Sequence, residues 1–245
     1  MKASEEIREA LARVAALRQA ATGPDELVQA LKAVKHLQAQ RFIGTYQDLL
    51  RHPVYGPSAR FFLEELYSAK DYSARDAQFS RIAGALERTF PAHILATVLT
   101  LTKLHQQTEE LDMALSQAWS QSSAPSGAAR YVAAWRTVGQ RTAREWQLAT
   151  VLSVGQTLSE LTRKPGLKLL LRMMRKPAEL AGLGSLQGFL EAGFDHFAGM
   201  ARQHDAVTHF LNTIRTRESA WIEQLFDADP ATCENELALT LGFAK

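Results

Sequence analysis

This sequence of 245 residues has one cysteine, no long apolar run and no large excess of either charge. Its one cysteine, Cys233, excludes an intramolecular disulfide and any thiolate-rich metal site. No stretch approaches the roughly eighteen uncharged apolar residues that a membrane-spanning helix needs. Residues 1–22 carry scattered charges and no apolar run of signal-peptide length. We therefore expect a cytoplasmic protein without a transmembrane segment.

The charge balance and the missing motifs limit the classes of function. A net charge of +2 is too small to indicate a nucleic-acid-binding protein by itself. The strings that mark a P-loop, a Rossmann turn, a zinc protease or a hydrolase nucleophile elbow are absent. The apolar fraction of 46% and the charged fraction of 22% are ordinary for a protein with a buried core. The sequence therefore favours a soluble globular protein of no familiar enzyme class.

Helical periodicity dominates the chain, and no stretch shows the alternation of a β-strand. Prolines, glycines and capping residues divide the periodic stretches, and the longest helix is expected from Ala128 to about Thr162. This pattern predicts an all-α fold without a sheet, a multi-helix bundle of roughly eight to ten helices. Because the loops are short, we expect a single helical domain over residues 1–245, with residues 1–22 and 227–245 as candidate peripheral segments.

One helix, expected over residues 91–121, carries polar residues inside its apolar stripe. At about 100° per residue, His105 and Asp112 lie within the apolar arc, and Glu109 lies about 40° from His105 on the same side. The apolar members of the arc are Ile94, Val98, Leu101 and Trp119. A stripe of this width normally faces a core. We therefore expect three ionisable side chains in a place where water is scarce.

This polar stripe supports three interpretations. In the favoured, structural one, a buried His105 hydrogen-bonds a carboxylate and an arginine pairs the rest, because an unmade buried hydrogen bond costs roughly 1–3 kcal/mol. In the second, His105, Glu109 and Asp112 form one side of a metal or haem site, with Glu65 or Glu145 from other helices. The Glu-x-x-His motif of di-iron bundles does not occur. The third is acid–base catalysis by His105. No cofactor and no metal is predicted.

A second charged group surrounds a short helix that is rich in phenylalanine. It consists of Arg60, Arg75, Asp76 and Arg81. An arginine–carboxylate fork between neighbouring helices is its favoured role, since a bidentate pair fixes the register of two elements. A pocket for a small anion is the alternative role of the same group.

The segment Arg163–Lys176 has six basic residues and no acidic one. The rest of the chain has 22 basic against 26 acidic residues, so the positive charge is concentrated in this segment. Lys168, Arg172 and Arg175 share one helical face and form a candidate anion-binding site. Such a helix can lie on an anionic membrane or contact nucleic-acid phosphates. The favoured alternative is a core helix whose charged edge is solvated or paired with acidic neighbours.

The stretch from Arg60 to Ile82, which reads RFFLEELYSAKDYSARDAQFSRI, resembles a family of uncharacterised bacterial helical proteins. Three later stretches are similar to the same family: LHQQTEELD (104–112), YVAAWRTVG (131–139) and LLRMMRKPAELAGLGSLQGFLEAGFD (170–195). The resemblance runs from about Arg41 to Glu218, and the FFLEELY string is its most specific part. It implies an all-helical bacterial protein and carries over no functional residue.

Three hypotheses of function follow from these observations. The leading one is a non-enzymatic cytoplasmic protein that binds a small ligand or a partner, either another protein or a second copy of the chain. The second is a helical, oxygenase-like enzyme that depends on a metal or haem and uses His105, Glu109, Asp112 and Glu65. The third is a peripheral binder of an anionic membrane or of nucleic acid through residues 163–176.

Overall fold

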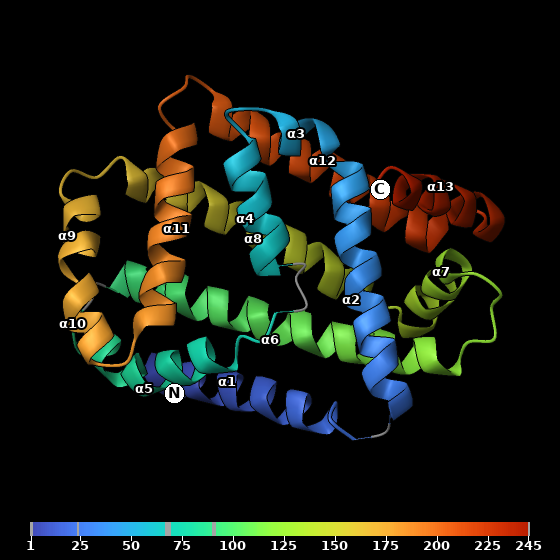
Figure 1. Ribbon diagram of the computed structural model, residues 1–245, viewed down its shortest axis with the longest axis horizontal. Coiled ribbons are helices and arrows are strands. Elements are labelled where there is room, and N and C mark those ends of the chain that lie inside the picture. The colour runs from blue at the N-terminus through green and yellow to red at the C-terminus, as the bar shows by residue number, and fades with distance from the viewer. Residues whose placement is uncertain (1, 24, 67–69, 90–91, 245) are drawn as a thin grey trace.

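The computed structural model describes residues 2–23, 25–66, 70–89 and 92–244. Within these residues every regular element is a helix, so the predicted all-α fold is confirmed. Figure 1 shows the helices packed on both sides of the long helix α6. The thirteen helices of the described chain are α1 (Ala3–Ala20), α2 (Asp25–Thr45), α3 (Gln47–Arg51), α4 (Gly56–Leu66), α5 (Ser73–Thr89), α6 (Ala92–Gln121), α7 (Gly127–Val138), α8 (Arg141–Thr162), α9 (Leu167–Met173), α10 (Arg175–Leu180), α11 (Gly184–Met200), α12 (Ala206–Asp227) and α13 (Pro230–Gly242).

The described chain has more helices than expected because short breaks divide stretches that the periodicity joined. The stretch from 128 to 162, expected as one helix, is two, since Gly139 and Gln140 have positive φ angles of 65° and 63°. The break turns the chain back, so that α8 crosses the molecule above α6 and behind α4 and α11 in the view of Figure 1. Shorter breaks at Tyr46 and Met174 separate α2 from α3 and α9 from α10.

The long helix α6 has 30 residues and lies through the middle of the molecule (Figure 1). It packs against α1 and α2 and also against α7 and α8. Its buried residues begin at Thr102 and become frequent between Leu111 and Trp119. Because neighbours cover α6 on several sides, polar side chains on it need partners from those neighbours. Pro91, the expected first residue of this helix, lies outside the described residues.

Two large hydrophobic clusters and a smaller one form the core. The first joins α2, α6, α7, α12 and α13 and contains Trp119, Trp135 and Trp221. The second joins α2, α3, α4, α8, α11 and α12 and includes an edge-to-face contact between the rings of Phe62 and Phe210. The third places α1 against α5 and α6. These clusters bury the apolar faces that the periodicity indicated.

Both ends of the chain pack into the body of the molecule. Ile7 of α1 has no exposed surface, and neither have Cys233 and Leu237 of α13. Within the described residues, both candidate peripheral segments, 1–22 and 227–245, thus contribute side chains to the core. The physical reason is that each end forms a helix with an apolar face, and that face is buried against its neighbours. The number of domains stays a prediction.

Candidate functional site

His105 on α6 faces Asp76 on α5, and its Nε2 atom lies 2.9 Å from Asp76 Oδ2. Arg18 on α1 joins them: its Nη1 lies 2.8 Å from the same oxygen and its Nη2 lies 3.2 Å from His105 Nε2. A carboxylate can only accept, so the contact with Asp76 requires a proton on His105 Nε2. In that tautomer Arg18 donates to Asp76 and makes no hydrogen bond to Nε2, because a guanidinium can only donate. One carboxylate therefore connects three helices.

The environment of Asp76 keeps its carboxyl ionised. Burial alone raises the pKa of Asp76, because it disfavours the charged form. The hydrogen bond and charge of His105, followed by the charge and hydrogen bond of Arg18, outweigh burial and hold the pKa of Asp76 below its ordinary value. Asp76 is thus ionised at neutral pH and can accept from both His105 and Arg18.

The other two acids of the α6 stripe bind different partners. Both carboxylate oxygens of Glu109 lie 3.2 Å from Lys35 Nζ on α2, and Arg18 Nη2 lies 3.8 Å from Glu109 Oε1. Asp112, nearly one turn further along, accepts a hydrogen bond of 3.0 Å from Gln38 on α2. The three ionisable side chains of the stripe therefore do not converge on one point, although Arg18 lies near both His105 and Glu109.

Asp112 is the most deeply buried acid of this stripe, with 5% of its surface exposed. Burial raises the pKa of Asp112 above its ordinary value, although the charge of Lys35, the hydrogen bond from Gln38 and the charge of Arg144 act in the opposite direction. A carboxylate in such a position costs stability whenever it is ionised. Asp112 is therefore a source of pH-dependent stability.

Glu65 on α4 joins the same network through Arg75 on α5. Arg75 Nη1 lies 2.5 Å from Glu65 Oε2, and Arg75 Nε lies 3.8 Å from Asp76 Oδ1. The guanidinium also lies over the ring of Tyr72, 4.2 Å from its centroid. Arg75 and Asp76, two members of the second charged group, therefore do form arginine–carboxylate contacts between helices.

The other two arginines of that group lie apart from the network. Arg60 donates to the carbonyl of Leu50, and Arg81 donates to the carbonyls of Ala181 and Gly182. These carbonyls stand at or just beyond helix ends, where the helix itself supplies no donor. The four residues of the second charged group therefore do not surround a common anion pocket.

The network is balanced in charge. Its cations are Arg18, Lys35 and Arg75, and its anions are Glu65, Asp76 and Glu109. Within the described residues, no group of three or more His, Cys, Asp and Glu side chains is arranged to hold a metal ion. The contacts support the structural interpretation of the stripe, in which polar bonds fix α1, α2 and α5 against α6 and join α4 to α5.

The three basic residues of the candidate anion-binding face have different surroundings. Lys168 Nζ lies 2.5 Å from Asp195 on α11, and Arg175 binds Glu191 on the same helix at 2.6–2.8 Å. Arg172 is exposed and has no carboxylate partner in the part of the chain that the structure describes. Two of the three cations therefore attach α9 and α10 to α11, and the third faces solvent.

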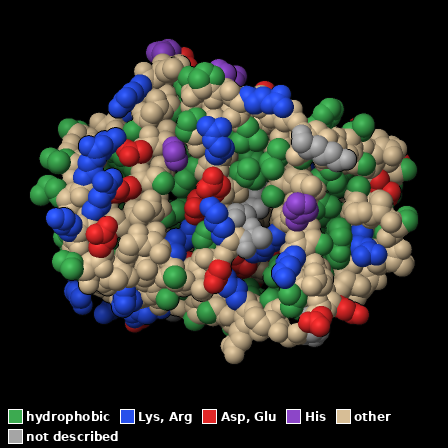
Figure 2. Space-filling model, in the orientation of Figure 1, with side chains coloured by type: hydrophobic (Ala, Val, Ile, Leu, Met, Phe, Trp, Pro, Cys, Tyr) green, Lys and Arg blue, Asp and Glu red, His purple; other side chains and the backbone are tan. Residues whose placement is uncertain are grey.

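The outer side of α9 and α10 is apolar as well as basic. No residue of α9 is buried. Five large apolar side chains are exposed here: Leu169 (62%), Leu170 (50%), Met173 (66%), Met174 (46%) and Leu180 (91%). They are more than half of the nine such side chains exposed on the described chain, and we call their surface the α9–α10 patch. At the left edge of Figure 2, over these helices, green apolar and blue basic side chains lie side by side.

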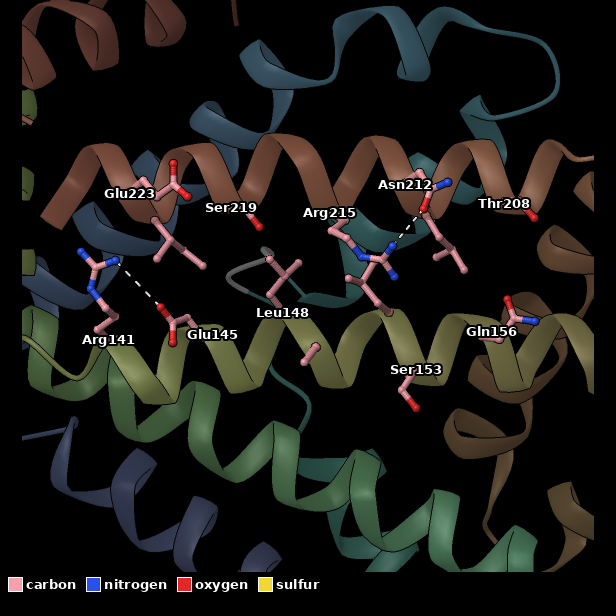
Figure 3. A pocket seen from close by; sticks show the side chains of 14 residues that line it. Arg141, Glu145, Leu148, Ser153, Gln156, Thr208, Asn212, Arg215, Ser219 and Glu223 are labelled. Carbon is pink, nitrogen blue, oxygen red and sulfur yellow. Dashed lines mark hydrogen bonds and ion pairs between the residues drawn. The ribbon is translucent and has the colours of Figure 1, made fainter. Parts of the chain in front are cut away.

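An open groove lies between α8 and α12 (Figure 3). The two helices run antiparallel, since Arg141 at the start of α8 pairs with Asp227 at the end of α12. The groove has a volume of about 670 Å³, and we call it the α8–α12 groove. Its apolar lining consists of Leu148, Ala149, Leu152, Leu211 and Ile222. Small-molecule sites are usually enclosed, so a groove of this kind suits an elongated partner better.

The comparisons with known proteins identify a family without an assigned activity. Residues 17–232 match a family model described as a domain of unknown function, DUF8198. The chain belongs to this family. Neither the comparison with curated proteins nor that with solved structures returned a match. The matched range contains the polar network, the α9–α10 patch and the α8–α12 groove, so a function is argued here from these sites.

Proposed function

We propose that this protein binds the surface of anionic membranes through the α9–α10 patch. The observation that carries the proposal is the exposure of five large apolar side chains between residues 169 and 180, a stretch that overlaps the basic segment 163–176 with its six basic residues. Exposed apolar surface costs roughly 25 cal/mol per Å² relative to burial, and a contiguous patch of it marks an interaction site. The basic side chains beside the patch favour an anionic occupant.

The angular positions of the side chains around α9 support binding to a membrane surface. At about 100° per residue, Leu169, Met173 and Leu170 span an arc of about 100°, and Arg172 lies about 60° beyond Leu169. The half-buried side of the helix carries Leu167 and Leu171. An apolar arc with a cation beside one edge matches the membrane–water interface, where the apolar side chains leave water and the cation remains among the headgroups.

The charges near the patch favour a membrane over nucleic acid. Within the described chain, Arg163, Lys164, Arg172 and Lys176 have no carboxylate partner. Each such cation near an anionic lipid surface contributes about 1 kcal/mol. Nucleic acid would use these cations but leave the apolar side chains in water, whereas a membrane uses both. No helix among the described residues is long and apolar enough to span a bilayer, so the proposed contact is with its surface.

Flotation with lipid vesicles tests the proposal. The protein should bind vesicles that contain phosphatidylglycerol, ignore pure phosphatidylcholine, and dissociate at about 1 M salt, where the Debye length is about 3 Å. Met173→Ser should weaken binding about ten-fold by removing apolar contact, and Arg172→Gln about five-fold by removing one charge. Leu239→Ser on α13 is the matched control, because Leu239 is as exposed as Met173, at 66%.

Three outcomes of these experiments would contradict the proposal. The first is failure to bind anionic vesicles at low salt. The second is binding to duplex DNA that Arg172→Gln weakens and Met173→Ser does not. The third is dimerisation in sedimentation that Met173→Ser abolishes, because the patch would then be covered by a second copy of the chain.

A second candidate function, binding of a protein partner, is favoured by the α8–α12 groove. From Arg141 to Gln156 the groove follows about 22 Å of α8, at about 1.5 Å per residue, which matches an amphipathic helix of about four turns. Glu223 lies near one end, where Arg141 pairs with Glu145 and Asp227, and Arg215 lies about two turns further along (Figure 3). The complementary helix carries a basic residue and, two turns away, an acidic one.

A pair of synthetic helical peptides tests this second candidate. The peptide with the complementary charge order should bind, and the same peptide with its charges exchanged should bind at least about ten-fold more weakly. Ala149→Trp, which fills the apolar lining of the groove, should abolish binding of the first peptide. Equal binding of both peptides, or of the wild type and Ala149→Trp, would contradict the groove assignment.

A cytoplasmic location and a bacterial origin, both expected from the sequence, stay predictions. The location bears on the proposal because the cytoplasmic leaflet carries the anionic lipids that give it a negative surface potential. Separation of cells into soluble and membrane fractions, with and without high salt, would place the native protein.

A further inference from the structure

A basic pocket lies beside the α9–α10 patch, where the end of α8, the start of α9 and the end of α11 meet. Four of its lining side chains are cationic: Arg163, Lys164, Lys168 and Arg202. No acidic residue is among the described residues that line it. The nearby carboxylate of Asp195 pairs with Lys168. The other three cations have no carboxylate partner in the described ranges, so the pocket has a net positive charge of three.

The size of this basic pocket suits a compact anion. Its volume is about 280 Å³, which admits a compact anion together with water. Two of its walls are Ala198 and Ala201, and Phe194 lines it as well. Because the alanines are small, they leave the space open, and a larger side chain at either position would occupy it.

We propose that the basic pocket binds a phosphomonoester group. Such a group carries a charge of about −1.5 to −2 near neutral pH, and its oxygens accept bidentate hydrogen bonds from arginine. Three uncompensated cations match this charge better than the single charge of a phosphodiester. The inference that the group belongs to a lipid headgroup rests on the proposed membrane function. The pocket and the patch are adjacent, because Leu169 and Leu170 of the patch directly follow Lys168 of the pocket.

The same cations also stand near the carboxyl ends of α8 and α11, where positive charge offsets the helix dipole. A role confined to that effect predicts that loss of Arg202 lowers stability and leaves the choice of lipid unchanged. A phosphate-binding role predicts that loss of Arg202 changes the choice of lipid. The preference between two lipids is therefore the deciding quantity, and thermal unfolding of each variant serves as the control for folding.

The first experiment compares vesicles that contain phosphatidate, a phosphomonoester, with vesicles that contain phosphatidylglycerol, a phosphodiester, adjusted to equal zeta potential. The wild type should prefer phosphatidate by at least about five-fold. Arg202→Gln should abolish the preference, and so should Ala198→Leu, which fills the pocket and keeps every charge. Arg172→Gln is the matched control: it removes one charge outside the pocket, so it should weaken binding to both vesicles and keep the preference.

The second experiment identifies a soluble source of the same group. Inorganic phosphate and glycerol 3-phosphate are titrated into the protein without vesicles, by calorimetry. Saturable binding that Ala198→Leu abolishes, without any preference for phosphatidate, would assign the pocket to a soluble phosphoester. If the protein binds phosphate but no vesicles, the proposed phosphate binding in the pocket is supported and the membrane function is refuted. Equal affinity for the two vesicles together with no binding of either soluble compound would overturn the inference.

Discussion

Lys168 on α9 is ion-paired with Asp195 on α11, and this contact helps to determine which side of α9 faces solvent. Arg175 forms the corresponding contact with Glu191, so that two ion pairs attach the basic side of α9 and α10 to α11. Exposed ion pairs of this kind contribute little to stability. Their effect here is orientation, because they leave the apolar arc that contains Met173 turned outward.

The contact between His105 and Asp76 predicts how substitutions of His105 affect stability. His105→Ala removes a donor to a largely buried carboxylate and should lower the free energy of unfolding by about 1–3 kcal/mol. His105→Gln should cost less, because its amide can still donate to Asp76. His204→Ala, at an almost fully exposed histidine, is the control and should have little effect. Urea unfolding measures all three variants. Equal losses for His105→Ala and His105→Gln would show that the hydrogen bond is unimportant.

Asp112 predicts a dependence of stability on pH. Because burial raises the pKa of Asp112, the folded protein holds that proton more tightly than the unfolded chain. This contribution is complete below about pH 4, the unfolded value, and is lost as the pH rises through the folded value. Asp112→Asn keeps an acceptor for Gln38 and removes the ionisation. Relative to the wild type, the variant should therefore become progressively more stable above about pH 4. A stability difference that is constant with pH would contradict this assignment.

The surroundings of Gly44 and Gly188 predict opposite effects of alanine substitution on stability. Gly44 lies where α2 and α13 are in close contact. A Cβ atom at Gly44 would overlap the backbone carbonyl of Thr240, so Gly44→Ala should cost about 1–3 kcal/mol or separate the two helices. Gly188 lies inside α11 with no atom near the position of an added Cβ. Gly188→Ala should stabilise the protein by about 0.5–1 kcal/mol. Thermal unfolding compares them, and a neutral Gly44→Ala would refute the close approach.

The side of α6 that carries His105 could be predicted from the sequence, but its partners could not. Periodicity places His105, Glu109 and Asp112 on the apolar side, because helix geometry is local. Arg18 and Asp76, which bind His105, are 87 and 29 residues away along the chain. Such contacts depend on how the helices pack, and a single sequence does not contain that information in local form.

The α9–α10 patch shows the opposite limit of sequence analysis. The common face of Lys168, Arg172 and Arg175 could be predicted from spacing. The same spacing predicts that the leucines of α9 are core residues, although Leu169 and Leu170 are exposed. Their exposure depends on Asp195 and Glu191, which belong to a different helix. The break at Gly139 and Gln140 cannot be predicted from periodicity, since the apolar periodicity continues through it. The periodicity therefore predicted the fold class better than the surface.

The most direct test of the membrane proposal is the environment of residue 173 when vesicles are present. Met173→Cys and Leu239→Cys place labels for a polarity-sensitive fluorophore at sites of equal exposure, and Cys233 has no exposed surface to react. The account predicts that phosphatidylglycerol vesicles shift the emission at residue 173 to the blue, that phosphatidylcholine vesicles do not, and that emission at residue 239 stays unchanged. An unchanged spectrum at residue 173, or an equal shift at both residues, would contradict it.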